Sequence, residues 1–367
     1  MAREYRPFMD WMKCVGIFLI VMGHVAGRPT NFALPPIYPK QLGVAFFIFV
    51  MAYSLARETR PRWQVLFNRL FEVYLFGGAI ALLLSIVMFA TRGTLQLSNY
   101  LPFALGVNVV FNNFPANPTM WYIGTYLHVL LLWALGLRHI RVRAWMLVVS
   151  FGLEVALRAI LIPTAGEYIA YMLLPNWVTV FMVGTLFGQQ AEARSTESPA
   201  NRRAGVAFYA LLAVAFGAVW YTITTPYVVD HSFPFMRLSS VGSLGDAAIT
   251  SVSVSVVYLA WTLLAFQITR RASAWTSVQF FARNTLIIFI AHMPVFYALD
   301  SVLRRWTIAY APRAVVQLLV CFVGLALISE VVTRAIRPKA LRDWVGQHLL
   351  GGTLAPAVIA PVAAKPR

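Results

Sequence analysis

Long apolar stretches recur along the 367-residue chain, and each is bounded by charged residues, proline or glycine. A helix needs about 20 mostly apolar residues to cross the hydrocarbon core of a bilayer. A window of that length predicts ten membrane-spanning helices, of which the second is short for a crossing. They are expected near residues 10–27, 41–56, 71–91, 119–137, 144–162, 168–188, 204–225, 246–268, 276–302 and 314–333.

Nothing in this pattern indicates a second folded unit. The segments between the apolar stretches are too short for a soluble domain, and no fixed-period repeat occurs. The sequence therefore predicts an all-α polytopic membrane protein with a single transmembrane domain over residues 1–337. Residues 338–367 are expected to form a cytoplasmic tail, with a short amphipathic helix through Trp344 and Leu349 and then a disordered end rich in alanine and proline.

The overall composition agrees with this class. Hydrophobic residues make up 60% of the chain and charged residues only 12%, where soluble domains carry about 25% charged residues. A soluble enzyme is therefore excluded, and a net charge of +17 on so apolar a chain does not indicate a nucleic-acid partner. Cys14 and Cys321 both lie in apolar stretches, so we expect neither a disulfide framework nor a cysteine zinc site.

The basic residues fall unevenly between the predicted helices. With the N-terminus inside, the inner segments hold 20 of the thirty Lys and Arg and the outer segments hold 8, while Lys13 and Arg283 lie within helices. Because cytoplasmic loops retain positive charge, both termini are expected in the cytoplasm. The net charge is then mainly a sign of topology, and attraction to anionic lipid is its secondary consequence.

Three ionisable residues share one face of the first predicted helix. Asp10, Lys13 and His24 stand at offsets 0, 3 and 14, and at about 100° per residue the step from Lys13 to His24 is close to a whole number of turns. That step rises about 16 Å, which puts Lys13 near the cytoplasmic surface and His24 toward the outer half. Ionisable residues at such depth are functional candidates. Two structural interpretations stay open, with Asp10 and Lys13 as interfacial residues and His24 as a histidine bonded to a neighbouring helix.

The ninth predicted helix carries a second polar set. Arg283 and Asn284 lie near its inner end, and His292 follows at a depth that should resemble that of His24. Pro294 removes one helical hydrogen bond just beyond this histidine, and a kink there would suit a cavity wall. The alternative is that His292 simply caps the carbonyl groups that the proline frees.

The segment from Leu95 to Thr119 is long and rich in asparagine residues, Asn113 among them, and it leads into Trp121 and Tyr122. Amides hydrogen-bond to hydroxyl groups and aromatic rings pack on sugar faces, so a re-entrant or lid segment of this composition suits a polyhydroxylated ligand. The alternative is an interfacial loop anchored by an aromatic belt.

The first helix, with Asp10, Lys13 and the Gly23-His24 pair, resembles the first-helix signature of the integral-membrane acyltransferase 3 family of O-acyltransferases. In that family a basic residue, usually arginine, is followed by ten positions and then a histidine; here the basic residue is Lys13. The Asp-x-x-Lys and Gly-His form is similar to the branch that contains fucose 4-O-acetylase-like proteins. Four further segments resemble family motifs in the expected order, so that the resemblance covers residues 5 to about 330: Phe46–Tyr53, Asn68–Leu70, Met120–Ile123 and Asn284–Pro294.

Besides Lys13, the chain departs from the family pattern at two further places. Met51 and Ala52 replace a Ser-Gly pair in the second helix. The carboxylate that many members carry after the tryptophan motif is absent, because Thr125 and Tyr126 occupy that region. No acidic residue is therefore assigned there.

The resemblance implies an O-acyltransferase of a bacterial inner membrane, most simply an acetyltransferase, with acyl-CoA as donor and a sugar or glycan precursor as acceptor. No permanently bound cofactor and no metal are expected. His24 is the expected general base, since neutral imidazole can take the proton of the acceptor hydroxyl. Lys13 or Arg69 would meet the phosphates of acyl-CoA, and Asp10 would hold Lys13 in place. The expected substrate-binding residues are Arg69, Trp121, Tyr122, Asn113, Arg283, Asn284 and His292.

The alternative function is a proton-coupled transporter or glycan exporter, because ten crossings and buried ionisable groups fit that class as well. Two features argue against it. The two halves show no matching pair of interrupted helices, and the informative charge is concentrated in the first helix.

Overall fold

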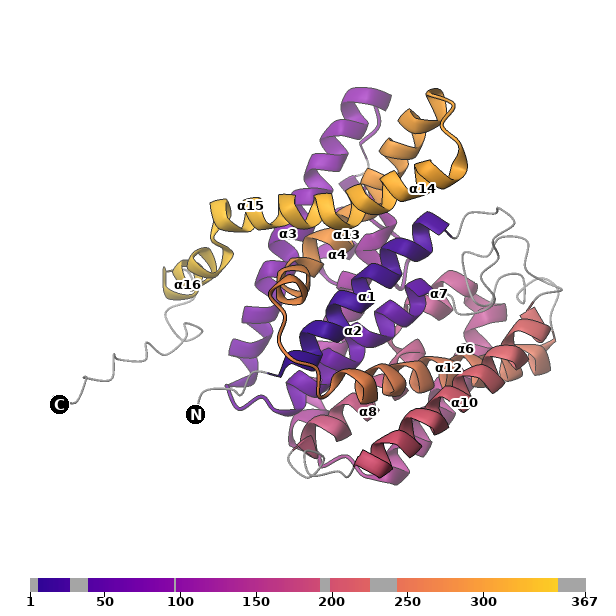
Figure 1. The fold of residues 1–367 in the computed structure, drawn as a ribbon. Helices are drawn as coiled ribbons and strands as arrows, with labels where there is room; N and C mark the ends of the chain where they lie inside the picture. The colour runs from indigo at the N-terminus through magenta and orange to yellow at the C-terminus, as the bar shows by residue number, and fades with distance from the viewer. Residues whose placement is uncertain (1–5, 27–38, 96, 192–198, 225–242, 349–367) are drawn as a thin grey trace.

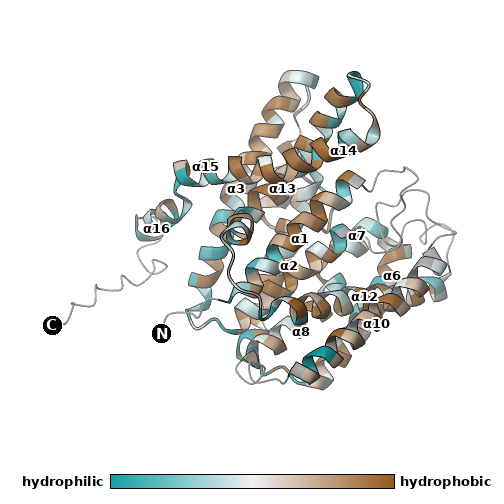
Figure 2. Ribbon diagram, in the orientation of Figure 1, coloured by the Kyte–Doolittle hydropathy of each residue, from teal (hydrophilic) through white to brown (hydrophobic). Residues whose placement is uncertain are grey.

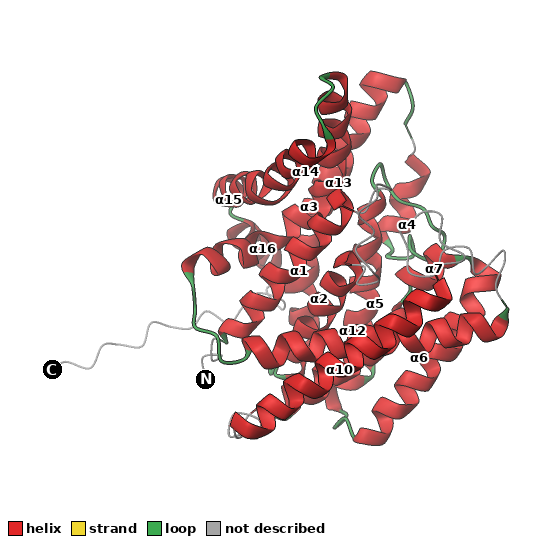
Figure 3. Ribbon diagram, turned by 45° about the vertical axis from the view of Figure 1, so that its right-hand side comes forward, coloured by secondary structure: helices red, strands yellow, loops and turns green. Residues whose placement is uncertain are grey.

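The computed structural model describes residues 6–26, 39–95, 97–191, 199–224 and 243–348, and these residues form helices joined by turns, with no strand among them (Figures 1 and 3). The first half contains α1 (Pro7–Ala26), α2 (Pro39–Ala56), α3 (Arg62–Arg92), α4 (Tyr100–Ala104), α5 (Trp121–Leu135), α6 (Ala144–Ala165), α7 (Glu167–Met172) and α8 (Val178–Gln189). The second half contains α10 (Pro199–Thr224), α12 (Leu244–Thr269), α13 (Thr276–Arg305), α14 (Tyr310–Leu318), α15 (Leu325–Ile336) and α16 (Pro338–His348).

The outer faces of the long helices are apolar. Among the described residues, seven helical segments are long and apolar enough to cross a membrane, and α2 and α8 are shorter apolar helices. Large hydrophobic side chains such as Leu83 on α3, Val148 on α6 and Val214 on α10 are exposed, and Figure 2 shows the same apolar colouring along these helices. The prediction of an all-α polytopic membrane protein is confirmed. The count of ten crossings and the cytoplasmic termini stay predictions.

Two predicted crossings differ from simple helices. The stretch at 168–188 is interrupted, because α7 ends at Met172, a 3₁₀ turn η4 (Leu174–Asn176) follows, and α8 begins at Val178. Pro175 in this turn has no N–H to continue α7. The stretch at 314–333 contains a π-helical segment, η6 (Leu319–Gly324), between α14 and α15.

The central helix α2 packs closely on both sides through glycines. A Cβ atom on Gly16 of α1 would lie 3.1 Å from the carbonyl oxygen of Gly43 on α2. On the other side, Cβ atoms on Gly184 and Gly188 of α8 would lie 2.7 and 2.6 Å from carbonyl oxygens of α2. Small residues four apart let helix backbones approach in a membrane, where lipid offers no hydrophobic drive for association. Close packing of α1 on α2 and of α2 on α8 therefore holds α1 among the central helices of the protein (Figure 1).

The tail begins with α16, which contacts α3. Trp344 on this helix is exposed, and Arg342 lies 4.0 Å from the carboxylate of Glu72 on α3. The predicted disordered end, residues 349–367, lies outside the described part of the chain.

Candidate functional site

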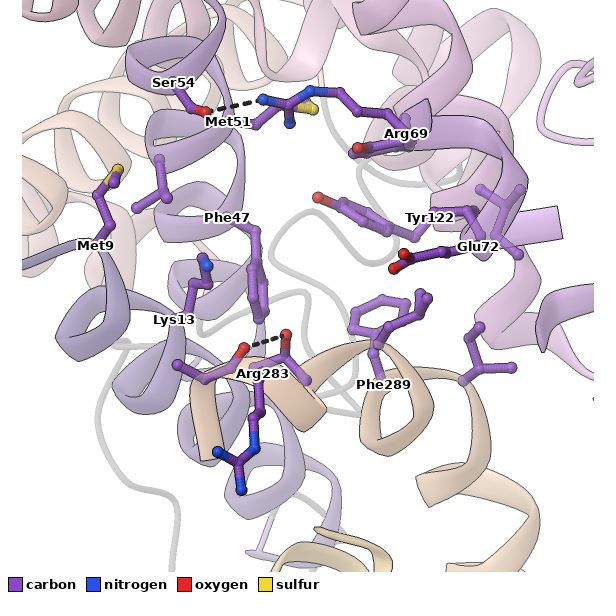
Figure 4. Close-up of a pocket in the computed structure, with 18 of the residues that line it drawn as sticks. Met9, Lys13, Phe47, Met51, Ser54, Arg69, Glu72, Tyr122, Arg283 and Phe289 are labelled. Carbon is purple, nitrogen blue, oxygen red and sulfur yellow. Dashed lines mark hydrogen bonds between the residues drawn. The ribbon is translucent and has the colours of Figure 1, made fainter. Parts of the chain in front are cut away.

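A cavity of about 470 Å³ lies between α1, α2, α3, α5 and α13. Its walls are mostly apolar and aromatic, but charged side chains enter it from two sides. Figure 4 shows Lys13 of α1 on one wall and Arg69 and Glu72 of α3 on the opposite wall. Because it contains two cationic groups, we call this space the cationic cavity. Its size and mixed lining are those of a small-molecule site.

The two cations of the cationic cavity are held by polar neighbours. The Lys13 Nζ atom lies 3.6 Å from the Asp10 carboxylate, one helical turn earlier on the same face. The guanidinium of Arg69 donates a hydrogen bond of 2.8 Å to the hydroxyl of Ser54 on α2. Arg69 is thus fixed across the cavity from Lys13, which leaves space between the two positive charges for a negatively charged group.

A second, smaller cavity of about 60 Å³ lies farther along α1 and is lined by His24 and His292. The rings of His24 on α1 and His292 on α13 have their centroids 5.0 Å apart, at 49° to each other. Lys40, Thr119, Trp121 and Tyr171 complete its polar and aromatic lining. We call this space the histidine cavity. Its volume accommodates one functional group of a ligand rather than a whole sugar.

Phe289 lines both cavities. Its ring packs 4.8 Å from the Tyr122 ring on the side of the cationic cavity, and it lies one turn before His292 on α13. From Lys13 to His24 the rise along α1 is about 16 Å. The two cavities therefore follow one another along α1, with a single aromatic side chain common to both.

The histidine cavity is bounded by a local break in the hydrogen bonding of α13. Pro294 has no N–H, so the carbonyl of Ile290, four residues earlier, loses its helical donor. The Asn117 amide and the Thr119 hydroxyl, both at the 3₁₀ turn η2 (Pro118–Met120), donate to this carbonyl at 2.7 and 3.0 Å. The alternative in which His292 caps that carbonyl is wrong, because its ring bonds to Ile288 and Phe289 instead.

The aromatic pair at the start of α5 divides between the two cavities. Tyr122 lines the cationic cavity and Trp121 lines the histidine cavity. The Trp121 ring packs 5.0 Å from that of Tyr171 and stacks on that of Trp177 at 6.5 Å. These rings offer flat apolar walls beside the imidazoles.

Three predicted substrate-binding residues do not point into either cavity. Arg283 contributes to the wall of the cationic cavity, but its guanidinium pairs with Glu330 of α15 at 2.9 Å, and Figure 4 shows that group turned away from the cavity. Asn284 donates to Glu330 and accepts a hydrogen bond from Ser329, so it joins α13 to α15. Asn113 is exposed and lines neither cavity.

A buried ion pair lies away from both cavities, and the charge pattern of the sequence did not single it out. Arg158 and Glu154 on α6 pair at 2.6 Å, with side chains 0% and 1% exposed. Arg158 also donates to Asn176, to the hydroxyl of Ser255 and to the carbonyl of Ser251, while Glu154 accepts from the Thr179 N–H at 2.8 Å. The expectation that transmembrane charge is concentrated in the first helix is wrong. Arg158 was one of the eight basic residues assigned to outer segments, but it lies within α6.

This network also explains the interruption between α7 and α8. Arg158 bonds both the side chain and the carbonyl of Asn176 in η4, so the broken turn is satisfied by protein groups. A broken transporter helix instead exposes its free ends to a substrate. The interruption is thus a structural joint and does not favour export.

Two cavity residues escaped the sequence-based prediction. Lys40 was assigned to an outer loop, yet it lines the histidine cavity, because Gly23 lets its backbone approach α1; a Cβ atom on Gly23 would lie 2.9 Å from the Lys40 nitrogen. Glu72 follows Arg69 by three residues on α3 and therefore faces the same cavity. Among the described residues, no group of three His, Cys, Asp or Glu side chains is placed to hold a metal ion.

Comparison with known proteins supplies the remaining finding. The family model for an acyltransferase domain of the acyltransferase 3 type matches residues 6–331, which include both cavities and every helix that lines them. No curated protein and no solved structure matches the chain. Since the family match spans most of the sequence, the chain belongs to the acyltransferase 3 family of membrane acyltransferases.

Proposed function

We propose that this membrane acyltransferase transfers an acetyl or other short acyl group from acyl-CoA to a hydroxyl of a sugar or glycan precursor at a bacterial inner membrane. The proposal includes ten crossings with both termini in the cytoplasm and a relation to the fucose 4-O-acetylase-like branch. No permanently bound cofactor is part of it.

The observation that supports this function is the succession of the two cavities along α1. The cationic cavity has Lys13 and Arg69 on opposite walls, where phosphate oxygens of a CoA thioester would be neutralised. The histidine cavity has two imidazoles at its centre and aromatic walls beside them. Acyl-CoA is a long, thin donor. With its phosphates in the cationic cavity and its thioester in the histidine cavity, its chain would pass Phe289.

Each polar residue then has a chemical role. Lys13 and Arg69 bind phosphate groups, and Asp10 keeps the Lys13 ammonium at the wall. The acceptor hydroxyl enters the histidine cavity beside Trp121, and its oxygen attacks the thioester carbonyl carbon while His24 takes its proton. The carbon–sulfur bond breaks, the ester leaves, and the proton returns to the thiolate of CoA.

The test uses the full chain in proteoliposomes with acetyl-CoA and a panel of mono- and oligosaccharide acceptors, followed by mass spectrometry of the products. An added acetyl group that requires acetyl-CoA, and does not form with CoA alone, is expected. His24→Ala should lower the rate by about 10²–10⁴-fold, since that is the usual contribution of a general base.

The matched control is His139→Ala, because His139 is an exposed histidine outside both cavities. It should acylate at the rate of the unchanged protein. Full activity of His24→Ala would remove His24 as the base. Absence of any acylated product with acetyl-CoA and longer acyl-CoA donors would remove the proposed donor class.

A further inference from the structure

The hydrogen bonds of His292 fix the position of its proton. Its Nδ1 atom lies 2.7 Å from the carbonyl oxygen of Phe289 and 3.1 Å from that of Ile288. A carbonyl oxygen only accepts hydrogen bonds, so Nδ1 must be the donor and carry the hydrogen. Neutral His292 is therefore held as the Nδ1–H tautomer, with the lone pair on Nε2.

That lone pair has no hydrogen-bond partner among the residues that the structure describes. The Nε2 atom of His292 is buried and accepts no hydrogen bond, although the side chain as a whole is 1% exposed. Because Nδ1 is bonded to the backbone of its own helix, Nε2 lies on the side of the ring away from α13. The ring of His24 lines the same cavity, with its centroid 5.0 Å from that of His292.

Burying an unsatisfied acceptor is costly, at about 1–3 kcal/mol, and native structures avoid it unless the group has a task. Nothing else requires this arrangement, since the freed carbonyl of Ile290 is already bonded to Asn117 and Thr119. The His292 ring is thus held by its backbone bonds with a basic nitrogen presented to the second histidine.

We propose that His292 is the positioning residue for His24: when the acceptor is bound, its fixed Nε2 accepts a hydrogen bond from an N–H of His24 and so directs the other His24 nitrogen, bare of hydrogen, at the acceptor hydroxyl. This inference rests on the proposed function, and it assigns the orientation of the base. When His24 takes the hydroxyl proton, both its nitrogens carry hydrogen, and the Nε2 atom of His292 stabilises the resulting cation. The proton then passes from His24 to the departing thiolate, so His292 ends the cycle unchanged.

Two amide substitutions separate this role from a purely structural one. Asparagine places its amide near the position of Nδ1, and glutamine reaches the position of Nε2. The same helix shows what asparagine does, since Asn284 donates its amide to the carbonyl of Phe280 one turn earlier, at 2.8 Å. His292→Asn therefore keeps the backbone bond and loses the acceptor facing His24. His292→Gln keeps an acceptor oxygen facing His24 and loses the backbone bond.

The experiment measures kcat and KM for acyl transfer by the full chain in proteoliposomes, together with the thermal unfolding midpoint. His292→Asn is expected to lower kcat about 100-fold or more, with KM for acyl-CoA unchanged. The kcat of His292→Gln should be at least about tenfold higher than that of His292→Asn. His139→Gln is the control for the chemical change itself.

Three outcomes decide the matter. A higher kcat for His292→Asn than for His292→Gln would overturn the proposal, because the backbone bond would then be the function of His292. Full activity in both variants would overturn it as well. No acylation by the unchanged protein would instead contradict the proposed function, so the two failures are distinguishable.

Discussion

The protein holds two sets of buried ionisable groups that differ in how completely those groups are hydrogen-bonded. In the Glu154–Arg158 network, all three guanidinium nitrogens donate and both carboxylate oxygens accept, with partners on α6, η4, α8 and α12. In the histidine cavity, the His292 Nε2 atom has no hydrogen-bond partner in the described part of the chain, and empty space remains beside it. A satisfied network stabilises one arrangement of helices, whereas an unsatisfied group next to a cavity is available for a ligand or a proton.

Breaking the satisfied network should have the largest effect on stability. Arg158→Met leaves the Glu154 carboxylate buried without its cation, which costs about 3–5 kcal/mol. We expect a large drop in the thermal unfolding midpoint of the protein in detergent. The double variant Glu154→Leu with Arg158→Met removes both charges and should recover most of that loss. A double variant as unstable as Arg158→Met alone would contradict a structural role for the pair.

The bonds at the Pro294 break should have the next largest effect. Asn117→Ala combined with Thr119→Val leaves the Ile290 carbonyl without a donor, at a cost of about 1–3 kcal/mol. Pro294→Ala supplies a main-chain N–H to the same carbonyl. The Asn117 and Thr119 substitutions should therefore cost less stability when they are combined with Pro294→Ala. A double-mutant cycle on unfolding midpoints measures this coupling. Strictly additive effects would mean that the carbonyl is not what Asn117 and Thr119 stabilise.

The cation of α1 should influence donor binding and leave stability largely unchanged. Lys13→Met removes a phosphate-binding charge and is expected to raise KM for acyl-CoA about tenfold, which corresponds to about 1.4 kcal/mol. Lys13→Arg should keep KM within about threefold of the unchanged protein, since a guanidinium also binds phosphate. Arg334→Met, which removes an exposed arginine on α15, is the matched control. An unchanged KM in Lys13→Met would contradict the assignment of the cationic cavity to the donor.

The smallest effect is expected at Asn113. Asn113→Ala should change the free energy of unfolding by less than about 0.5 kcal/mol, because the side chain is exposed. Acyl transfer should proceed at the unchanged rate, as Asn113 lines neither cavity. A loss of acceptor binding, measured as a raised KM, would show that the asparagine-rich segment reaches the substrate.

Helical periodicity was informative within a helix and uninformative between helices. The common face of Asp10, Lys13 and His24 follows from 3.6 residues per turn, and the structure places Lys13 and His24 at the two cavities with Asp10 beside Lys13. The side chain of Arg283 points toward Glu330 because of where α15 packs, and the local sequence pattern does not predict that packing. An acid and a base four residues apart in an apolar stretch, as at Glu154 and Arg158, are a detectable signal of an internal ion pair.

Lys40 and the Asn117–Thr119 contacts lie beyond sequence reasoning for another reason. Each depends on close approach between segments distant in the chain: α2 against Gly23, and η2 against a carbonyl freed by Pro294. The proline predicts an unsatisfied carbonyl, but its donors follow only from the tertiary arrangement.

The most direct test of one path from the cationic cavity to the histidine pair is a sided assay in sealed proteoliposomes. Radiolabelled acetyl-CoA is supplied on one side only and the acceptor sugar on the other, with the orientation of the chain determined by protease access to its tail. We predict labelled product only when acetyl-CoA is on the side of Lys13 and the acceptor is on the opposite side, and loss of this product in His24→Ala. Product that forms only when donor and acceptor share one side would contradict the path.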